Sequence, residues 1–272
     1  MKGRWTFDMA GVLVMAALCM SADTGKAEAG DAGDLQPWQK RAVAYAAILS
    51  QAKWEPVTNG IPMRGKGEFA PGAAKTGVPY SNGGREGRKI GFDVNLRTFL
   101  AALENPRSVL YTTSLRDQRR NAAAFYGTVC SGLTSYALQL GMQIGSSWHG
   151  PQTRAGVALA EPQSAQGARV GDVLWNKGHV ALVTRVTTAA DGTVTHVRVE
   201  ESAPPTTRTR NYTAALFEEF LATRKVTIFR ITDYEAWRGE NRAERFLFPN
   251  YALDAAPATI NRTVLLDLGD WV

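Results

Sequence analysis

The chain has 272 residues, of which 44% are apolar and 21% charged, and its formal net charge at neutral pH is +6. That length suffices for one sizeable core, or for one domain with a small appendage. The basic residues are scattered, with only short clusters such as 116–120, so the composition argues against nucleic acid as the partner. A positive surface suits an anionic cell wall or membrane surface, and it also serves plain solubility.

Residues 1–29 are organised like a secretory signal peptide. Two basic residues near the start precede a short apolar run over 9–20, and Ala27-Glu-Ala29 is the small-x-small pattern that favours cleavage before Gly30. The run is too short to span a bilayer as a helix, so we expect no stable membrane insertion once the leader is removed. A lipidated Cys19 is the alternative, but the usual small residue before such a cysteine is missing. The sequence therefore predicts a secreted or periplasmic protein.

The first half of the remaining chain is predicted to hold helices and one long loop. Helices are expected over 37–54 and 95–104, and from about Cys130 to Gly141. Between the first two, residues 59–88 are rich in glycine and proline and contain Gly77-Val-Pro-Tyr-Ser-Asn-Gly-Gly84. Long loops of this kind often border functional sites.

After Gly167 the pattern changes from helix to strand. Strands are expected over 170–175, 179–186, 193–201, 226–231 and 263–268, with helices over 214–223 and around 234–245. Asp191-Gly192 is a hairpin signal between the second and third of these strands. Helices first and strands second predict an α+β domain in which helices pack on an antiparallel sheet.

Cys130 is the one cysteine that remains after loss of the leader, since the other is Cys19. An unpaired cysteine in an exported protein calls for a chemical explanation, because oxidising compartments favour pairs. At a helix start, free amides and the helix dipole stabilise a thiolate, and the amide of Cys130 could stabilise an oxyanion. The alternative is a small buried apolar side chain, which is what most free cysteines are.

His179, at the start of a predicted strand, is the candidate base for that thiol. A turn at Asp191-Gly192 sets residue 201 opposite residue 182, which brings Glu201 near His179 as the orienting residue. Both polar residues end rows of apolar residues, so we expect them to point inward. His196 would lie roughly 25 Å away along the strands and is too distant to orient His179. Glu200 replaces Glu201 if the turn slips by one residue.

Other polar residues have simpler explanations. His149 stands in Trp148-His-Gly-Pro, a predicted loop, where surface histidines are common. Asp172 follows a glycine and is most simply a turn residue. The three histidines show no His-x-x-x-His or His-Glu-x-x-His spacing, so no metal site is expected.

Three sequence blocks, in order, resemble the NlpC/P60 group of papain-like cysteine peptidases. They are Gly77-Val-Pro-Tyr80 with Asn82-Gly-Gly84, then Cys130-Ser-Gly-Leu133, then Gly171-Asp-Val-Leu174 with His179-Val-Ala-Leu-Val183. The resemblance implies a papain-like fold, a nucleophile at Cys130, a base at His179, an orienting residue at Glu201 and substrate contacts at Tyr80 and Ser131. It also implies hydrolysis of an amide bond in peptidoglycan stem peptides through a thioester, without a cofactor.

The sequence also departs from that family. Val129 stands where Asp commonly precedes the cysteine, and the third catalytic residue is typically His, Asn or Gln in place of Glu. The expected organisation is a leader over 1–29, a catalytic domain over 30–231 with an insertion around 85–125, and an extension of unknown role over 232–272. Alternatives are cleavage of the muramoyl-peptide amide, lipid or protein acyl transfer at the same site, and a wall-binding module without catalysis.

Overall fold

The computed structural model describes residues 35–55, 62–63, 67–80, 128–140, 145–146 and 155–240. Several sequence predictions lie outside these residues: the leader, the helix over 95–104, the insertion around 85–125, His149 and the strand over 263–268. The structure therefore leaves them as predictions.

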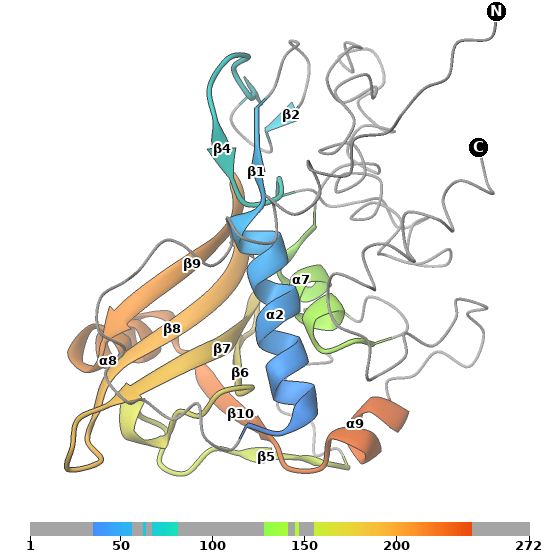
Figure 1. The fold of residues 1–272 in the computed structure, drawn as a ribbon. Helices are drawn as coiled ribbons and strands as arrows, with labels where there is room; N and C mark the ends of the chain where they lie inside the picture. The colour runs from blue at the N-terminus through green and yellow to red at the C-terminus, as the bar shows by residue number, and fades with distance from the viewer. Residues whose placement is uncertain are drawn as a thin grey trace, which may run out of the picture.

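An antiparallel sheet of six strands dominates the described residues (Figure 1). Its spatial order is β5-β10-β6-β7-β8-β9. The strands are β5 (Val157–Leu159), β6 (Val173–Asn176), β7 (His179–Thr188), β8 (Val194–Ala203), β9 (Thr206–Thr213) and β10 (Thr227–Ile231). Two short pairs accompany it: β1 (Lys53–Trp54) with β4 (Lys75–Thr76), and β2 (Pro62–Met63) with β3 (Gly67–Glu68).

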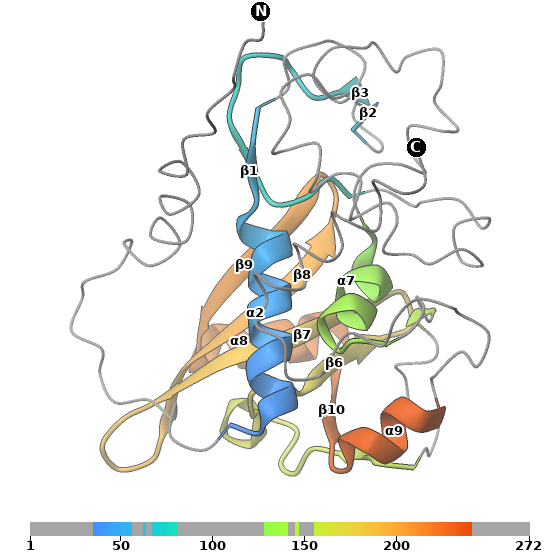
Figure 2. The same cartoon turned by 45° about the vertical axis from the view of Figure 1, so that its right-hand side comes forward.

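The helices cover both faces of this sheet (Figures 1 and 2). α2 (Pro37–Gln51) and α7 (Cys130–Ala137) pack side by side against one face, and α8 (Ala214–Arg224) packs against the other. The short helix η4 (Ala165–Gly167) contacts α8, and α9 (Tyr234–Glu240) follows β10. The predicted α+β class, with helices packed on an antiparallel sheet, is confirmed.

Two apolar clusters fill the space on either side of the sheet. The first lies under α2 and α7 and includes Leu49, Leu133 and Leu182, together with Cys130. The second lies under α8 and includes Val183, Val199 and Phe217. Alternate residues of β7 belong to alternate clusters, as expected for a strand buried on both faces.

α9 belongs to the same core, although the sequence suggested an extension after residue 231. Tyr234 and Trp237 are buried in the first cluster, and the ring of Tyr234 stacks on Trp38 with centroids 5.0 Å apart. The Tyr234 hydroxyl donates to the carbonyl oxygen of Leu138 at 2.8 Å. These contacts attach α9 to both α2 and the end of α7.

The two helices that form the first cluster end earlier than the sequence predicts. α2 ends at Gln51 because the chain at Gly77 and Val78 donates its amides to the carbonyl oxygens of Ala52 and Leu49. α7 ends at Ala137, four residues before the predicted Gly141. Gln139 takes the left-handed conformation there, with φ 55°, and the amides of Gln139 and Leu140 close the helix as in a Schellman motif.

The register of β7 and β8 also differs from the sequence prediction. The loop runs over residues 189–193, not over two residues, and shifts occur between Thr187 and Thr188 and between Val183 and Arg185. Thr187 pairs with His196 as predicted, but Glu201 pairs with Ala181 instead of Leu182. Opposite residues point to the same face of a sheet, so this one-residue shift sets Glu201 on the face of Ala181 and His179.

Candidate functional site

Cys130 is the first residue of α7, as the sequence predicts. Its N-cap, Val129, has an extended backbone and no side-chain cap, so amides of the first turn are left without helical partners. The residue is 7% exposed. The imidazole of His179 and the amides of Val180 and Ser131 lie close enough to its sulfur to lower the pKa of the thiol. The helix start thus presents sulfur to β7.

His179 opens β7 after a tight turn from β6. The turn is fixed by the amide of Gly178, which donates to Asn176 Oδ1 at 3.0 Å. His179 Nε2 lies 3.0 Å from Glu201 Oε2, and the imidazole side chain is 28% exposed. Because Nε2 faces Glu201, Nδ1 is the nitrogen left to bond the sulfur of Cys130. The imidazole therefore bridges the thiol and the carboxylate.

Glu201 lies near the end of β8 and is 9% exposed. Its other oxygen, Oε1, accepts from Arg208 Nε at 2.7 Å and from Arg210 Nε at 3.0 Å. Both arginines belong to β9, where residue 208 pairs directly with residue 201. One carboxylate is thus surrounded by an imidazole and two guanidinium groups.

These contacts shift the pKa values of all three groups. Burial raises the pKa of the Cys130 thiol, but the hydrogen bond and charge of His179 outweigh it, and the pKa is lowered. Burial opposes protonation of His179, yet Cys130 and Glu201 raise its pKa to about 9. Burial likewise opposes ionisation of Glu201, but His179 and Arg208 lower its pKa to about 2.

The directions of these shifts favour a thiolate beside an imidazolium near neutral pH. A thiolate is the nucleophilic form of cysteine, and an imidazolium can protonate a leaving group. Amides at the start of α7, that of Cys130 among them, are suited to stabilise an oxyanion next to the sulfur. This arrangement is chemically able to attack and cleave an acyl bond.

The structure gives a place to the glycine-rich block before the insertion. The amide of Tyr80 donates to the carbonyl oxygen of Pro205 at 2.8 Å, and Tyr80 forms a bridge with Thr128, two residues before Cys130. Gly77 has φ +83°, and a Cβ atom there would lie 1.7 Å from the backbone oxygen of Thr207. Half-buried Tyr80 therefore lies beside the chain that leads into α7.

The structure brings the three predicted catalytic residues, Cys130, His179 and Glu201, close together. Their catalytic roles remain predictions. Glu200, the alternative to Glu201, lies elsewhere: it is 1% exposed and bonds Arg198 and Thr209. Ser131 is buried directly after Cys130. His196 lies exposed with its ring against Thr195, remote from the cysteine as expected.

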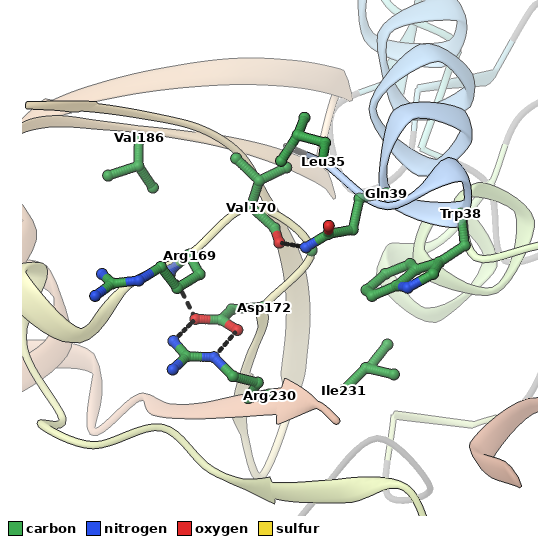
Figure 3. A pocket seen from close by; sticks show the side chains of 10 residues that line it. Leu35, Trp38, Gln39, Arg169, Val170, Asp172, Val186, Arg230 and Ile231 are labelled. Carbon is green, nitrogen blue, oxygen red and sulfur yellow. Dashed lines mark hydrogen bonds and ion pairs between the residues drawn. The ribbon is translucent and has the colours of Figure 1, made fainter. Parts of the chain in front are cut away.

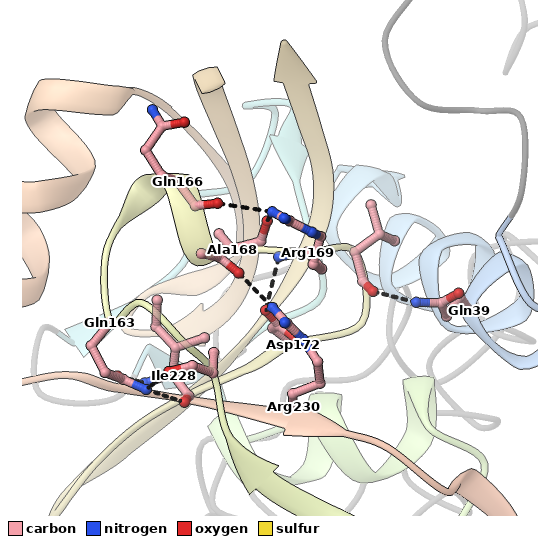
Figure 4. A network of polar contacts seen from close by, with 11 residues as sticks. Gln39, Gln163, Gln166, Ala168, Arg169, Asp172, Ile228 and Arg230 are labelled. Atoms are coloured by element: carbon pink, nitrogen blue, oxygen red, sulfur yellow. Dashed lines mark hydrogen bonds and ion pairs between the residues drawn. The ribbon is translucent and has the colours of Figure 1, made fainter. Parts of the chain in front are cut away.

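Asp172 has a larger role than a turn residue. It accepts from the amide of Arg169 at 2.8 Å, as a turn aspartate does. It also forms a two-point ion pair with Arg230, at 3.0 and 2.7 Å, while 1% exposed (Figure 4). This pair ties the turn before β6 to β10, so its role is structural.

A cavity of about 290 Å³ opens beside this ion pair (Figure 3). Its lining includes Trp38, Arg169 and Val186. Val186 lies seven residues from His179 along β7, which is about 23 Å at ~3.3 Å per residue. The lining includes none of Cys130, His179 and Glu201, and the polar contacts around the cavity join protein groups to each other (Figure 4).

Sequence reasoning missed Arg208 and Arg210. They lie in Thr206-Thr-Arg-Thr-Arg-Asn-Tyr-Thr213, which lacks the apolar alternation that predicts a strand. β9 is an edge strand of the sheet, so it needs fewer apolar residues. The signal that could have predicted this strand was the alternation of the large side chains Arg208, Arg210 and Tyr212 with small polar ones.

Within the described residues, no group of His, Cys, Asp and Glu side chains is arranged to hold a metal ion. No described helix is long and apolar enough to cross a membrane. Comparison with families of known proteins, with curated proteins and with solved structures found no match. The function must therefore be inferred from the site itself.

Proposed function

We propose that this chain is a papain-like cysteine amidohydrolase that cleaves amide bonds in peptidoglycan stem peptides. One observation carries the proposal: the His179 imidazole acts on the Cys130 thiol, whose pKa it lowers, and is hydrogen-bonded at 3.0 Å to the Glu201 carboxylate. Cys130 stands at the N-terminus of a buried helix packed on the sheet. Nucleophile, base and orienting group in this order are the requirements of acyl transfer through sulfur.

In the first half of the reaction, the Cys130 thiolate attacks the carbonyl carbon of the substrate amide. The negative charge that develops on the carbonyl oxygen is stabilised by amides at the start of α7. His179 gives its proton to the amide nitrogen as the carbon–nitrogen bond breaks. The amine leaves, and the acyl group remains on sulfur as a thioester.

In the second half, His179 takes a proton from a water molecule, which attacks the thioester carbon. The carbon–sulfur bond breaks, the carboxylic acid product leaves, and the thiolate–imidazolium pair is restored. The net reaction converts one amide and one water into a carboxylic acid and an amine. Glu201 does not exchange a proton: it holds the ring and stabilises the imidazolium.

The choice of peptidoglycan rests on the resemblance to NlpC/P60 peptidases and on the net positive charge. The position of Tyr80 supports it, because the residue that the resemblance assigns to substrate binding lies beside the chain entering α7. The expected bond joins D-glutamate to the diamino acid of the stem peptide. Cleavage of the muramoyl-peptide amide would use the same chemistry at sulfur.

The test is digestion of purified peptidoglycan by the protein lacking residues 1–29 and by its Cys130→Ala variant. Released fragments are identified by mass spectrometry, and their masses name the bond. We expect stem-peptide fragments that depend on Cys130. Cysteine-dependent release of intact stem peptides would instead identify a muramoyl amidase.

Two further variants sharpen this experiment. His179→Ala should abolish release, whereas His196→Ala should leave it unchanged, because His196 lies exposed on the far part of β8. If no variant differs from the wild type, the proposed chemistry is wrong. If no fragment appears although Cys130 reacts rapidly with iodoacetamide, the site is an acyl transferase or hydrolase for another substrate.

A further inference from the structure

Among the residues that the structure describes, positive charge exceeds negative charge around Glu201. Its single carboxylate is bonded by Arg208, Arg210 and His179. The His179 charge is balanced by the Cys130 thiolate when the two form an ion pair. Glu201 then balances only one of its two arginines, and one full positive charge remains beside the catalytic residues.

A further arginine lies in the same neighbourhood. The charges of Arg208, Arg210 and Arg224 all act on the hydroxyl of Tyr212, as does that of Glu201. Arg224 is the last residue of α8, and Tyr212 belongs to β9 next to Arg210 in the strand alternation. Arg208, Arg210 and Arg224 therefore all lie near Tyr212.

The two arginines on Glu201 are anchored but accessible. Each contacts Glu201 through Nε, and their side chains are 33% and 47% exposed. A guanidinium held at Nε still carries four N–H donors on its Nη atoms, and this planar fork matches a carboxylate. The outer side of β9 bonds residues 78–80 at Thr206 and Thr207, and no strand of the described sheet lies beyond Arg208 and Arg210. The fork is thus fixed in direction and reachable by solvent.

A purely structural role does not require this arrangement. On the opposite face of β8, buried Glu200 is neutralised by a single arginine, Arg198 at 3.1 Å, with Thr209 supplying the remaining hydrogen bonds. Two arginines on one oxygen repel each other, and the repulsion is relieved when a second anion arrives. Among the described residues, Glu201 is the one carboxylate that contacts Arg208 and Arg210.

We propose that Arg208 and Arg210 form a subsite that binds a carboxylate of the substrate, so that the site prefers peptides with a free carboxylate near the scissile bond. This inference rests on the proposed function for the identity of the substrate. The subsite itself is formed by Arg208 and Arg210, both held by Glu201, and does not depend on the identity of the substrate. It would select acidic over amidated stem peptides.

The first test compares two alkylating reagents of similar size, the anion iodoacetate and neutral iodoacetamide. Both react with the Cys130 thiolate, forming a thioether and releasing iodide, so neither requires hydrolytic activity. The measured quantity is the ratio of the two second-order rate constants at pH 7 and low salt. We expect Arg210→Gln to lower the iodoacetate-to-iodoacetamide ratio by roughly threefold to tenfold, as loss of one nearby charge predicts.

Control variants distinguish the effect of the Arg210 charge from the effect of Arg210 on the position of Glu201. Arg198→Gln removes an arginine that bonds Glu200 on the other face and should leave the ratio unchanged. Arg210→Lys keeps the charge and should retain most of the ratio. If Arg210→Gln slows both reagents equally, the arginine only positions Glu201 and the inference is overturned.

The second test measures binding of stem peptides to the Cys130→Ala variant by calorimetry. A tetrapeptide stem with free carboxylates should bind at least threefold more tightly than its amidated form, and Arg210→Gln should remove this difference. Equal binding of the two peptides, or no binding, overturns the carboxylate subsite even if the wild type digests peptidoglycan. A clear preference without any digestion supports the subsite and rejects the proposed hydrolysis.

Discussion

Replacing Glu201 by glutamine tests how the carboxylate acts on His179. The variant loses one negative charge but keeps a side chain that can accept a hydrogen bond from Nε2, which lies 3.0 Å from Glu201 in the wild type. The ring should stay in place. Burial opposes the imidazolium, and Cys130 and Glu201 together raise the His179 pKa to about 9. Without the Glu201 charge, this pKa should fall toward its usual value of 6.5.

The size of the effect on catalysis follows from the fraction of imidazolium. A histidine whose pKa is raised stays protonated at low pH and loses its proton as the pH rises through the raised value. At pH 8.5 the wild-type ring is mostly protonated, whereas a ring with the usual pKa is about 1% protonated. We therefore expect Glu201→Gln to lose up to roughly 70-fold in hydrolysis at pH 8.5 and little at pH 6.

Two measurements check this prediction. Titration of the histidine ring signals by nuclear magnetic resonance is tractable because the chain has three histidines, and it gives the His179 pKa directly. The pH profile of hydrolysis then shows whether the alkaline limb moves. Glu200→Gln is the matched control on the other face of β8. If Glu201→Gln titrates and reacts like the wild type, Glu201 does not set the His179 charge.

Three further predictions concern stability. Burial opposes ionisation of Glu201, but its partners lower its pKa from 4.5 to about 2. Stability from this group is present above pH 4.5 and lost as the pH falls through about 2. The loss is on the order of 3 kcal/mol in urea denaturation, and Glu201→Gln should lack it. Gly77→Ala should cost at least about 2 kcal/mol, since its Cβ would meet the backbone of β9 at 1.7 Å. Gly192→Ala, with the same φ of +83° but open space, should cost about half of that, and equal costs would refute the steric argument. Asp172→Ala should cost about 3–5 kcal/mol in thermal or urea denaturation by leaving Arg230 unpaired. The double variant with Arg230→Met should recover part of this loss, and no recovery would show that the charge is not the cause.

Much of the fold and two of the three candidate catalytic residues could be predicted from local patterns. The helix at Cys130 and the strand at His179 follow from the spacing of nearby apolar residues. The α+β class follows from the order of these elements. Such patterns depend on near neighbours in the chain, so they survive without knowledge of the tertiary structure.

Glu201 lies beside His179, as the sequence predicts, but the predicted register that placed it there is wrong by one residue. Without the shift between Val183 and Arg185, Glu201 would stand opposite Leu182, on the face away from His179. Nothing in the local sequence marks that bulge, because strands accept many residues there and packing decides where the extra residue goes.

The sequence by itself determined where the candidate nucleophile and base stand, since Cys130 and His179 are set at the starts of their elements by local periodicity. Only the tertiary structure decided how these groups are charged. The partners of Glu201 come from a polar edge strand, and Arg208 reaches it through cross-strand pairing. Register and charge pairing depend on contacts between distant segments, and no local pattern encodes the distance between two side chains on separate strands.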